Sequence, residues 1–316
     1  MPMPKVSIII PTHNRPHLLP FAIESVRASG VDVEVIVVDD ASQDKTAEVC
    51  QAIKDIKYIR LDQNHGVAGA RNFGLVASTG EFITFLDDDD LRIPGSLATQ
   101  VKMLAADKKA AVVYGQAECW DQDGEKPSLI YPRSCLEGDV FWDLLERNFI
   151  PCGSALFRRS CLRRVGLLES SLSGIDDWDL WIRLAELYPF RSLKEPVLKW
   201  TRSNPASQQG SSNAATMVEK STLQFKKRWV KLPRAASATT EMRTKAWKRF
   251  SANMAAHLCW EAIRSLKHRS PRQVMKNCFA LMRLGPFPVV RLARHYADTK
   301  ILFGTLNGEV DAVRLP

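Results

Sequence analysis

Hydrophobic residues in the first hundred or so positions follow two alternating spacings. Short runs rich in β-branched residues, typical of strands buried on both faces, cover Val6–Ile10, Val33–Val38, Lys57–Leu61, Phe82–Leu86 and Ala111–Tyr114. Between these runs, apolar residues recur three and four positions apart, which predicts helices around residues 18–26, 46–53, 68–77 and 97–104. Strands that alternate with helices pair in parallel, so the pattern predicts an α/β fold with a mainly parallel sheet flanked by helices.

The pattern changes in the second half of the chain. A further helix is predicted from Asp176. The segment Ser203–Asn213 is rich in Ser, Gln and Asn, which predicts a loop. After this segment the apolar residues keep helical spacing only. We therefore divide the chain into an α/β domain over residues 1–215 and a helical segment over residues 216–316.

Charge is distributed unevenly between these two parts. The chain carries 44 Lys and Arg against 35 Asp and Glu, a net charge of +9. Residues 226–316 hold 19 basic and 5 acidic residues, whereas residues 1–225 hold 25 and 30. The helical segment is therefore strongly basic, and the body of the chain is mildly acidic.

A basic helical segment can meet nucleic acid, an anionic membrane surface or only water. The segment carries no nucleic-acid-binding motif, which argues against nucleic acid as a partner. Lys245, Lys248 and Arg249 flank Trp247 and Phe250, as expected of a helix whose apolar stripe either packs internally or enters a membrane interface. Peripheral membrane contact through residues 226–300 and simple solvation of the helix faces both stay open.

Cellular location is indicated by features that the sequence lacks. No run approaches the roughly 20 apolar residues of a membrane span, and the apolar run in Met1–Ile10 is too short for a signal peptide. Seven cysteines without a C-x-x-C pair indicate reduced thiols. We expect a cytoplasmic protein, with peripheral attachment at the inner face of the membrane as a hypothesis for its basic segment.

Four consecutive aspartates, Asp87–Asp90, follow the predicted strand Phe82–Leu86. Like charges so close together repel and raise one another's pKa. A solvated acidic turn is one interpretation of such a run. Ligands of parallel sheets, however, bind beyond the carboxyl ends of the strands, and hard cations prefer carboxylate oxygens. The run therefore predicts a site for a divalent cation, Mn²⁺ or Mg²⁺.

Four segments in this order resemble the family 2 glycosyltransferases with the GT-A fold: VSIIIPTHNR (Val6–Arg15), VIVVDDASQDKT (Val35–Thr46), GVAGARNFGLVASTGEFITFLDDDD (Gly66–Asp90) and GIDDWDLWIRL (Gly174–Leu184). The resemblance implies a GT-A type domain with a helical C-terminal appendage. It also implies a metal-dependent inverting glycosyltransferase that moves a hexose-like sugar from a nucleotide-diphosphate sugar, UDP-linked, to an acceptor hydroxyl. The acceptor would be a glycan or a lipid-linked molecule, in polysaccharide or glycolipid synthesis.

The resemblance also implies roles for the matching residues. Those that would line the nucleotide pocket are Pro11, Thr12, His13 and Asn14. Asp40 would accept a hydrogen bond from the imide of the base, and Arg71 would lie near the nucleotide. In the aspartate run, Asp87 would lie toward the ribose, Asp89 on the metal and Asp88 between them. Asp177, the second member of an acidic pair, would be the catalytic base.

Purely structural roles are available for several of these residues. His13 could be an ordinary residue at a strand end, Asp40 could cap a turn, and Arg71 could be a surface charge. Asp176, the first member of the acidic pair, suits the N-terminus of a helix, where the macrodipole favours a carboxylate.

Two departures from the family pattern bear on function. Many relatives carry R-x-H-P-x-S after the catalytic helix, and Asn204 stands at the position of that histidine. Processive synthases carry Q-x-x-R-W, whereas Gln224–Trp229 is one residue longer; together with the lack of a run long enough to span a membrane, this argues against the processive class. Two other functions compete with sugar transfer as interpretations of this sequence. A catalytically silent nucleotide-sugar-binding protein stays open, whereas a sugar nucleotidyltransferase would need a Gly-rich basic loop where this chain has Pro11–Asn14.

Overall fold

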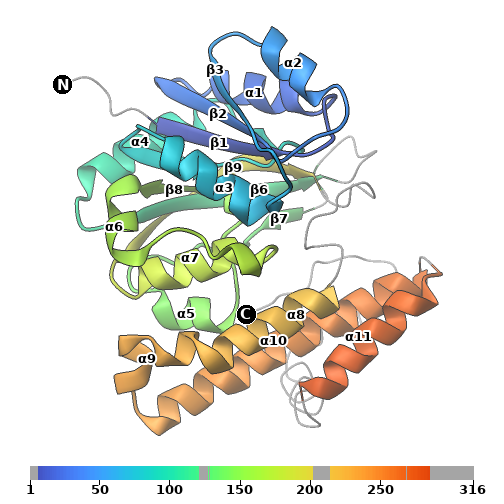
Figure 1. The fold of residues 1–316 in the computed structure, drawn as a ribbon. Coiled ribbons are helices and arrows are strands. Elements are labelled where there is room, and N and C mark those ends of the chain that lie inside the picture. Colours follow the sequence, from blue (N-terminus) through green and yellow to red (C-terminus); the bar gives the residue numbers. More distant parts are fainter. Residues whose placement is uncertain (1–5, 121–126, 128, 202–213, 268, 285–316) are drawn as a thin grey trace. The chain divides into compact units, whose positions relative to one another are not determined.

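The structure is a computed structural model, which describes residues 6–120, 127, 129–201, 214–267 and 269–284 (Figure 1). The chain divides into two compact units. The first, residues 1–141 with 148–209, is α/β, and the second, residues 142–147 with 210–316, is helical over its described part. The boundary between residues 215 and 216 stays a prediction; it falls in the first turn of helix α8, which begins at Ala214.

Nine strands form one sheet within the described residues, and all belong to the first unit. They are β1 (Val6–Thr12), β2 (Val33–Asp39), β3 (Ile56–Arg60), β4 (Phe82–Phe85), β5 (Leu91–Arg92), β6 (Val112–Trp120), β7 (Leu129–Tyr131), β8 (Ala155–Arg158) and β9 (Phe190–Thr201). The helices of this unit are α1 (Leu19–Arg27), α2 (Thr46–Ala52), α3 (Gly66–Ala77), α4 (Ser96–Ala106), α6 (Leu162–Val165) and α7 (Asp176–Ala185). Helix α5 (Phe141–Glu146) has only its first residue in the first unit.

The strand order is β3-β2-β1-β4-β8-β6-β9-β5, with β7 added beside β6. Strands β3, β2, β1 and β4 are all parallel, as the alternating pattern of the first hundred residues predicts. Beyond β4 the sheet is mixed, because β8 pairs antiparallel with both β4 and β6 while β9 runs parallel to β6. The predicted α/β fold is confirmed, and antiparallel pairing in its second half is an addition.

Both faces of β1 are covered by helices. All seven of its residues are buried, and Ile8 and Ile10 pack on one face with core residues of α1 and α4. Ile9 points to the other face, where an added Cβ on Gly74 of α3 would lie 2.3 Å from its Cγ2. This double covering is the reason that the strand reads as a continuous apolar run rather than as an alternation.

The described part of the second unit is helical, as expected. Its elements after α5 are α8 (Ala214–Lys227), α9 (Pro233–Ser237), α10 (Thr240–Lys267) and α11 (Pro271–Arg283). Phe250 is fully buried and stacks with Trp247 at 5.6 Å between ring centroids, and Phe225 of α8 lies 4.7 Å from Phe250. The stripe of Trp247 and Phe250 is therefore internal packing. Among the described helices, none combines the length and hydropathy that crossing a bilayer requires.

Candidate active site

Three neighbouring parallel strands end at the same edge of the sheet. Thr12 at the end of β1 is paired with Asp39 at the end of β2, and Ile9 of β1 is paired with Phe85 at the end of β4. The turns after these strands carry Pro-Thr-His-Asn, the Asp39–Asp40 pair and the aspartate run. The sheet therefore gathers the predicted binding residues at one edge, because carboxyl ends of parallel strands lie together.

Asp88 is committed to the fold rather than open to a ligand. Its side chain is buried, accepts a hydrogen bond from the Thr12 hydroxyl at 2.7 Å, and pairs with Arg15 at 2.8 Å. Burial raises the pKa of Asp88, while Arg15 and Thr12 act in the opposite direction. These contacts hold the aspartate run against the end of β1. Thr12 is buried with it, and Pro11 is buried within the strand.

The other three aspartates of the run converge on one point. Asp87, Asp89 and Asp90 each offer a carboxylate oxygen within 4.8 Å of the other two. Burial, together with repulsion from Asp87 and Asp88, raises the pKa of Asp89 to about 7. Burial, together with repulsion from Asp87 and Asp89, raises the pKa of Asp90 well above its usual range. Three mutually repelling oxygens fit a hard divalent cation, which would neutralise them.

Arg71 joins the aspartate run to helix α7. Its Nη2 lies 2.6 Å from Asp87 Oδ1 and its Nη1 lies 2.7 Å from Asp176 Oδ2, and its side chain is only 5% exposed. The guanidinium also lies over the ring of Phe85, 5.3 Å from the centroid. The interpretation of Arg71 as a surface charge is therefore wrong, because the residue is a buried cation between two carboxylates.

Replacing Arg71 by lysine should lower the free energy of unfolding by about 2 kcal/mol, because one ammonium group cannot bond both carboxylates with the same geometry. Urea unfolding followed by circular dichroism would measure the loss. The matched control is Arg27→Lys, since Arg27 is 37% exposed and, among the described residues, contacts only the Lys54 carbonyl and Glu24 through its guanidinium; it should change stability by less than about 0.5 kcal/mol. Equal stabilities of the two variants would contradict a bridging role for Arg71.

The two acidic residues at the start of α7 have different surroundings. Asp176 is buried and bound to Arg71, whereas Asp177 is half-buried. Asp177 accepts the Trp178 N–H at 2.7 Å and the side-chain amide of Asn148 at 3.3 Å. Burial first and repulsion by Asp176 second raise the pKa of Asp177 to about 7, against the opposing effect of Arg71. Asp177 is thus a carboxylate able to exchange a proton near neutral pH.

The turn after β1 is tied to the turn after β2. His13 Nδ1 lies 2.7 Å from the carbonyl oxygen of Asp40; a carbonyl only accepts, so this nitrogen donates. The Asp40 carboxylate accepts the His65 N–H at 2.7 Å, and Asn14 accepts the Gln43 N–H at 2.8 Å. A hollow opens beside these turns, and its lining residues are Ala41, Ser42, Gln43, Arg60, Leu61 and Asp62.

Sequence reasoning missed several residues of this edge. Asp90 was one position beyond the assigned motif, and Arg15 directly follows the Pro-Thr-His-Asn turn, so both had a local signal. Asn148 had none, because it reaches Asp177 from 29 residues away through the fold. The whole predicted loop Ser203–Asn213, with Asn204, lies outside the described residues.

Comparison with known proteins identifies the fold and the family. The model of the family described as "Glycosyl transferase family 2" matches residues 7–166. The TarS protein of S. aureus in complex with UDP-GlcNAc superimposes with a TM-score of 0.55 at 17% identity, covering 86% of this chain and 89% of that one. Mannosyltransferase PcManGT from Pyrobaculum calidifontis, in complex with GDP-Man and Mn²⁺, superimposes with a TM-score of 0.53 at 20% identity. The match covers 92% of this chain and 87% of that one. The fold is thus of the GT-A type.

Sequence relatives agree with this assignment. The chain is 47% identical over 120 residues to the GalNAc(5)-diNAcBac-PP-undecaprenol beta-1,3-glucosyltransferase of Campylobacter jejuni, covering 36% of this chain and 38% of that protein. It is 32% identical over 195 residues to an uncharacterised glycosyltransferase of Rickettsia typhi, covering 58% of this chain and 61% of that protein. The chain thus spans less than two thirds of the length of these relatives. Because the family model covers half of its 316 residues, the protein belongs to glycosyl transferase family 2.

Proposed function

We propose that the protein is a metal-dependent inverting glycosyltransferase that moves a sugar from a nucleotide-diphosphate sugar, UDP-linked, to an acceptor hydroxyl. One observation carries the proposal. Three carboxylates that can share a cation lie at the carboxyl end of β4, and Arg71 links that cluster to the helix that bears Asp177. A cation held by the cluster would attract the diphosphate of the donor, and Asp177 would accept the proton of the acceptor hydroxyl.

The donor set supports a divalent cation, Mn²⁺ or Mg²⁺. Asp87, Asp89 and Asp90 offer carboxylate oxygens, which hard cations prefer. A bound cation would supply positive charge that stabilises the diphosphate as negative charge develops on it. Asp89 is the ligand assigned by the motif, and Asp87, already paired with Arg71, lies toward the ribose. Asp88 holds the run in place through Thr12 and Arg15.

Asp177 acts as the catalytic base in this proposal. It accepts the proton of the acceptor hydroxyl while the acceptor oxygen bonds to the anomeric carbon. The bond between that carbon and the diphosphate oxygen breaks, and its electron pair leaves with the diphosphate. A single displacement of this kind inverts the anomeric configuration. The Trp178 N–H and the Asn148 amide orient the carboxylate, whose pKa of about 7 suits the role.

Asp40 is the residue that assigns the nucleobase of the donor. Its carboxylate is oriented by the His65 N–H and would accept the imide N–H of uracil, with His13 and Asn14 beside it. TarS, which was solved with UDP-GlcNAc, supports a UDP-linked donor. PcManGT was solved with GDP-Man, so both nucleotides belong in a donor panel.

The acceptor in the proposal is a glycan or a lipid-linked molecule, in polysaccharide or glycolipid synthesis. The Campylobacter jejuni relative supports this class, because its name describes an acceptor glycan carried on undecaprenol diphosphate. A lipid-linked acceptor lies at a membrane surface, where an enzyme would meet it. The proposal therefore includes a cytoplasmic protein attached peripherally to the inner face of the membrane.

A donor panel tests the proposed activity. The purified chain is incubated with UDP-glucose, UDP-N-acetylglucosamine, UDP-galactose or GDP-mannose, with Mn²⁺ or with EDTA, and release of the nucleoside diphosphate is measured. We expect slow UDP release from at least one donor with Mn²⁺ and none with EDTA. Release of GDP alone would contradict the UDP assignment. Nucleotide binding without release from any donor would instead favour the catalytically silent alternative.

A further inference from the structure

Helix α11 presents an apolar stripe to solvent. Met275, Phe279 and Met282 are 58%, 60% and 64% exposed, and their spacing of four and three residues places them on one side of the helix. The opposite side is held by its own unit, because Asn277, Ala280 and Leu284 are buried. The outward side therefore carries three exposed large apolar side chains, whereas the inward side buries Asn277, Ala280 and, directly after the helix, Leu284.

A basic edge runs along this stripe. On a helical projection, Arg272, Lys276 and Arg283 fall next to Phe279, and all three are exposed. The helix from Pro271 to Arg283 contains no Asp or Glu. Arg283 pairs with Glu219 of α8 at 2.6 Å, whereas no described residue forms an ion pair with Arg272 or Lys276. The outward side of α11 thus joins large apolar side chains to uncompensated positive charge.

We propose that this outward side, the α11 face (Arg272, Met275, Lys276, Phe279 and Met282), docks on an anionic lipid surface. Its apolar stripe would enter the boundary between headgroups and acyl chains, and its basic edge would contact the negative headgroups. A second copy of this chain fits the face less well, because pairing two such faces would bring positive edges together. The inference rests on the proposed function only in the reason for membrane attachment, a lipid-linked acceptor.

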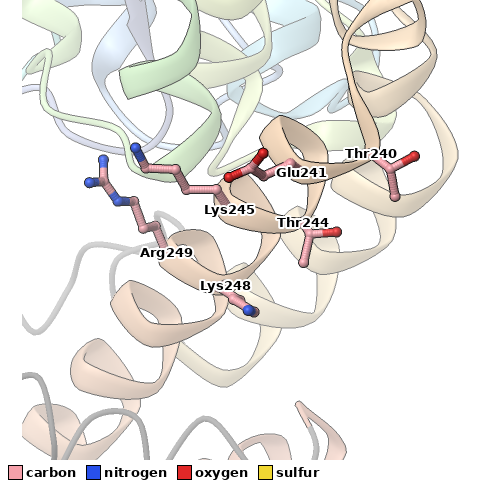
Figure 2. A pocket seen from close by; sticks show the side chains of 6 residues that line it. All are labelled: Thr240, Glu241, Thr244, Lys245, Lys248 and Arg249. Carbon is pink, nitrogen blue, oxygen red and sulfur yellow. The ribbon is translucent and has the colours of Figure 1, made fainter.

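Two other features of the second unit, the stripe of Trp247 and Phe250 and a hollow on α10, are weaker candidates for membrane docking. Phe250 is fully buried, and the half-buried Trp247 stacks on it and lies 5.2 Å from Phe225 between ring centroids. A hollow on α10 is lined by Lys245, Lys248 and Arg249 among polar residues, but Figure 2 shows Lys245 and Arg249 extending to one side and Lys248 to another. Arg249 also pairs with Glu146 at 3.2 Å. The hollow therefore offers no apolar anchor and no converging set of cations, whereas the α11 face has an apolar anchor beside its cations.

Vesicle flotation of the full chain tests the α11 face. Vesicles of phosphatidylcholine alone are compared with vesicles that also contain phosphatidylglycerol, at low and at high salt. The native protein should float with the anionic vesicles and should float less at high salt, since salt screens exposed charges. The variant Met275→Ser/Phe279→Ser/Met282→Ser should lower the partition coefficient at least tenfold. Arg272→Gln/Lys276→Gln should remove most of the preference for anionic vesicles.

The matched control is Phe21→Ser on helix α1, because Phe21 is 66% exposed and belongs to the α/β unit. It should leave flotation unchanged. All substituted residues are exposed, so each variant should retain its circular-dichroism melting temperature and its metal-dependent donor hydrolysis in solution. Hydrolysis tests the proposed function separately from membrane docking.

Three results would overturn the inference while leaving the proposed function intact. The first is a native protein that hydrolyses donor but does not float with either kind of vesicle. The second is a triple apolar variant that floats as well as the native protein. The third is a native dimer in light scattering that becomes monomeric in the triple variant, which would assign the face to a second copy.

Discussion

Asp89→Asn should reduce metal-dependent donor turnover by about 10²- to 10³-fold, the usual loss when one group that stabilises developing charge is removed. Asp89 carries one of the three oxygens that converge within 4.8 Å, and no other described residue replaces it in that cluster. Thermal stabilisation by Mn²⁺ should shrink with the activity. The measurements are UDP release and the melting temperature as functions of Mn²⁺ concentration.

In the absence of metal, the Asp89→Asn substitution should not lower the stability of the protein, although it lowers the activity. Burial and repulsion by Asp87 and Asp88 raise the pKa of Asp89 to about 7, so its ionised form is disfavoured in the folded protein. A group with a raised folded-state pKa favours folding while it is protonated at low pH, and this contribution is lost as the pH rises through about 7. At pH 8 without metal, Asp89→Asn should therefore melt at or above the native temperature.

The neighbouring variant Asp88→Asn is the matched control, because it removes one charge from the same run. Asp88 bonds Thr12 at 2.7 Å and Arg15 at 2.8 Å in a buried position, so its replacement should lower the melting temperature. An Asp89 variant that keeps the native Mn²⁺ dependence would contradict the metal assignment. A loss of stability greater than that of Asp88→Asn would assign Asp89 to the fold instead.

Asp177→Asn should reduce turnover by about 10²-fold or more while donor affinity stays within about twofold, because the amide keeps shape but cannot accept the proton. Donor affinity is measured by calorimetry and turnover by UDP release with acceptor present. The matched control is Asp179→Asn on the same helix, where Asp179 bonds Arg183 at 2.8 Å. That control should cost stability without a comparable loss of turnover. Near-native turnover in Asp177→Asn would remove this residue as the base.

The pH dependence of the native enzyme provides a second test of Asp177. A base with a pKa of about 7 must be ionised to act, so turnover at saturating donor and metal should fall tenfold for each pH unit below about 7. The same raised pKa means that the free energy of unfolding decreases as the pH rises from about 4 toward 7. Asp177→Asn should lack this loss and should be at least as stable as the native protein at pH 8.

Much of the first unit could be predicted from the sequence, because local patterns there are strong. The β-branched run of β1 is buried on both faces, and the helices between the strands keep regular apolar spacing. Parallel order follows from that alternation. The motifs that follow β1, β2 and β4 were therefore placed correctly at one edge of the sheet. The antiparallel strand β8 was not predicted, because its four residues carry no period that distinguishes a strand from a turn.

Within the aspartate run, the sequence determined only that four carboxylates follow a buried strand. Tertiary structure decided how they divide: Asp88 is bound by Thr12 and Arg15, Asp89 shares Arg15 at 3.1 Å while it joins the cluster, and Asp90 turns into that cluster with Asp87. The bond between Arg71 and Asp176 joins residues 105 positions apart. No local spacing predicts such pairs, since the direction of each side chain depends on what the packed neighbours offer.

The same distinction applies to the helical segment. The sequence by itself determined its positive charge and its helical period, both of which follow from composition and spacing. It also placed apolar residues on both sides of α11, and it could not decide which side is buried. Packing decided that Ala280 and Leu284 face inward while Phe279 stays exposed. The reason is physical: a helix buries the side that fits its neighbours most closely, and those neighbours are distant in sequence.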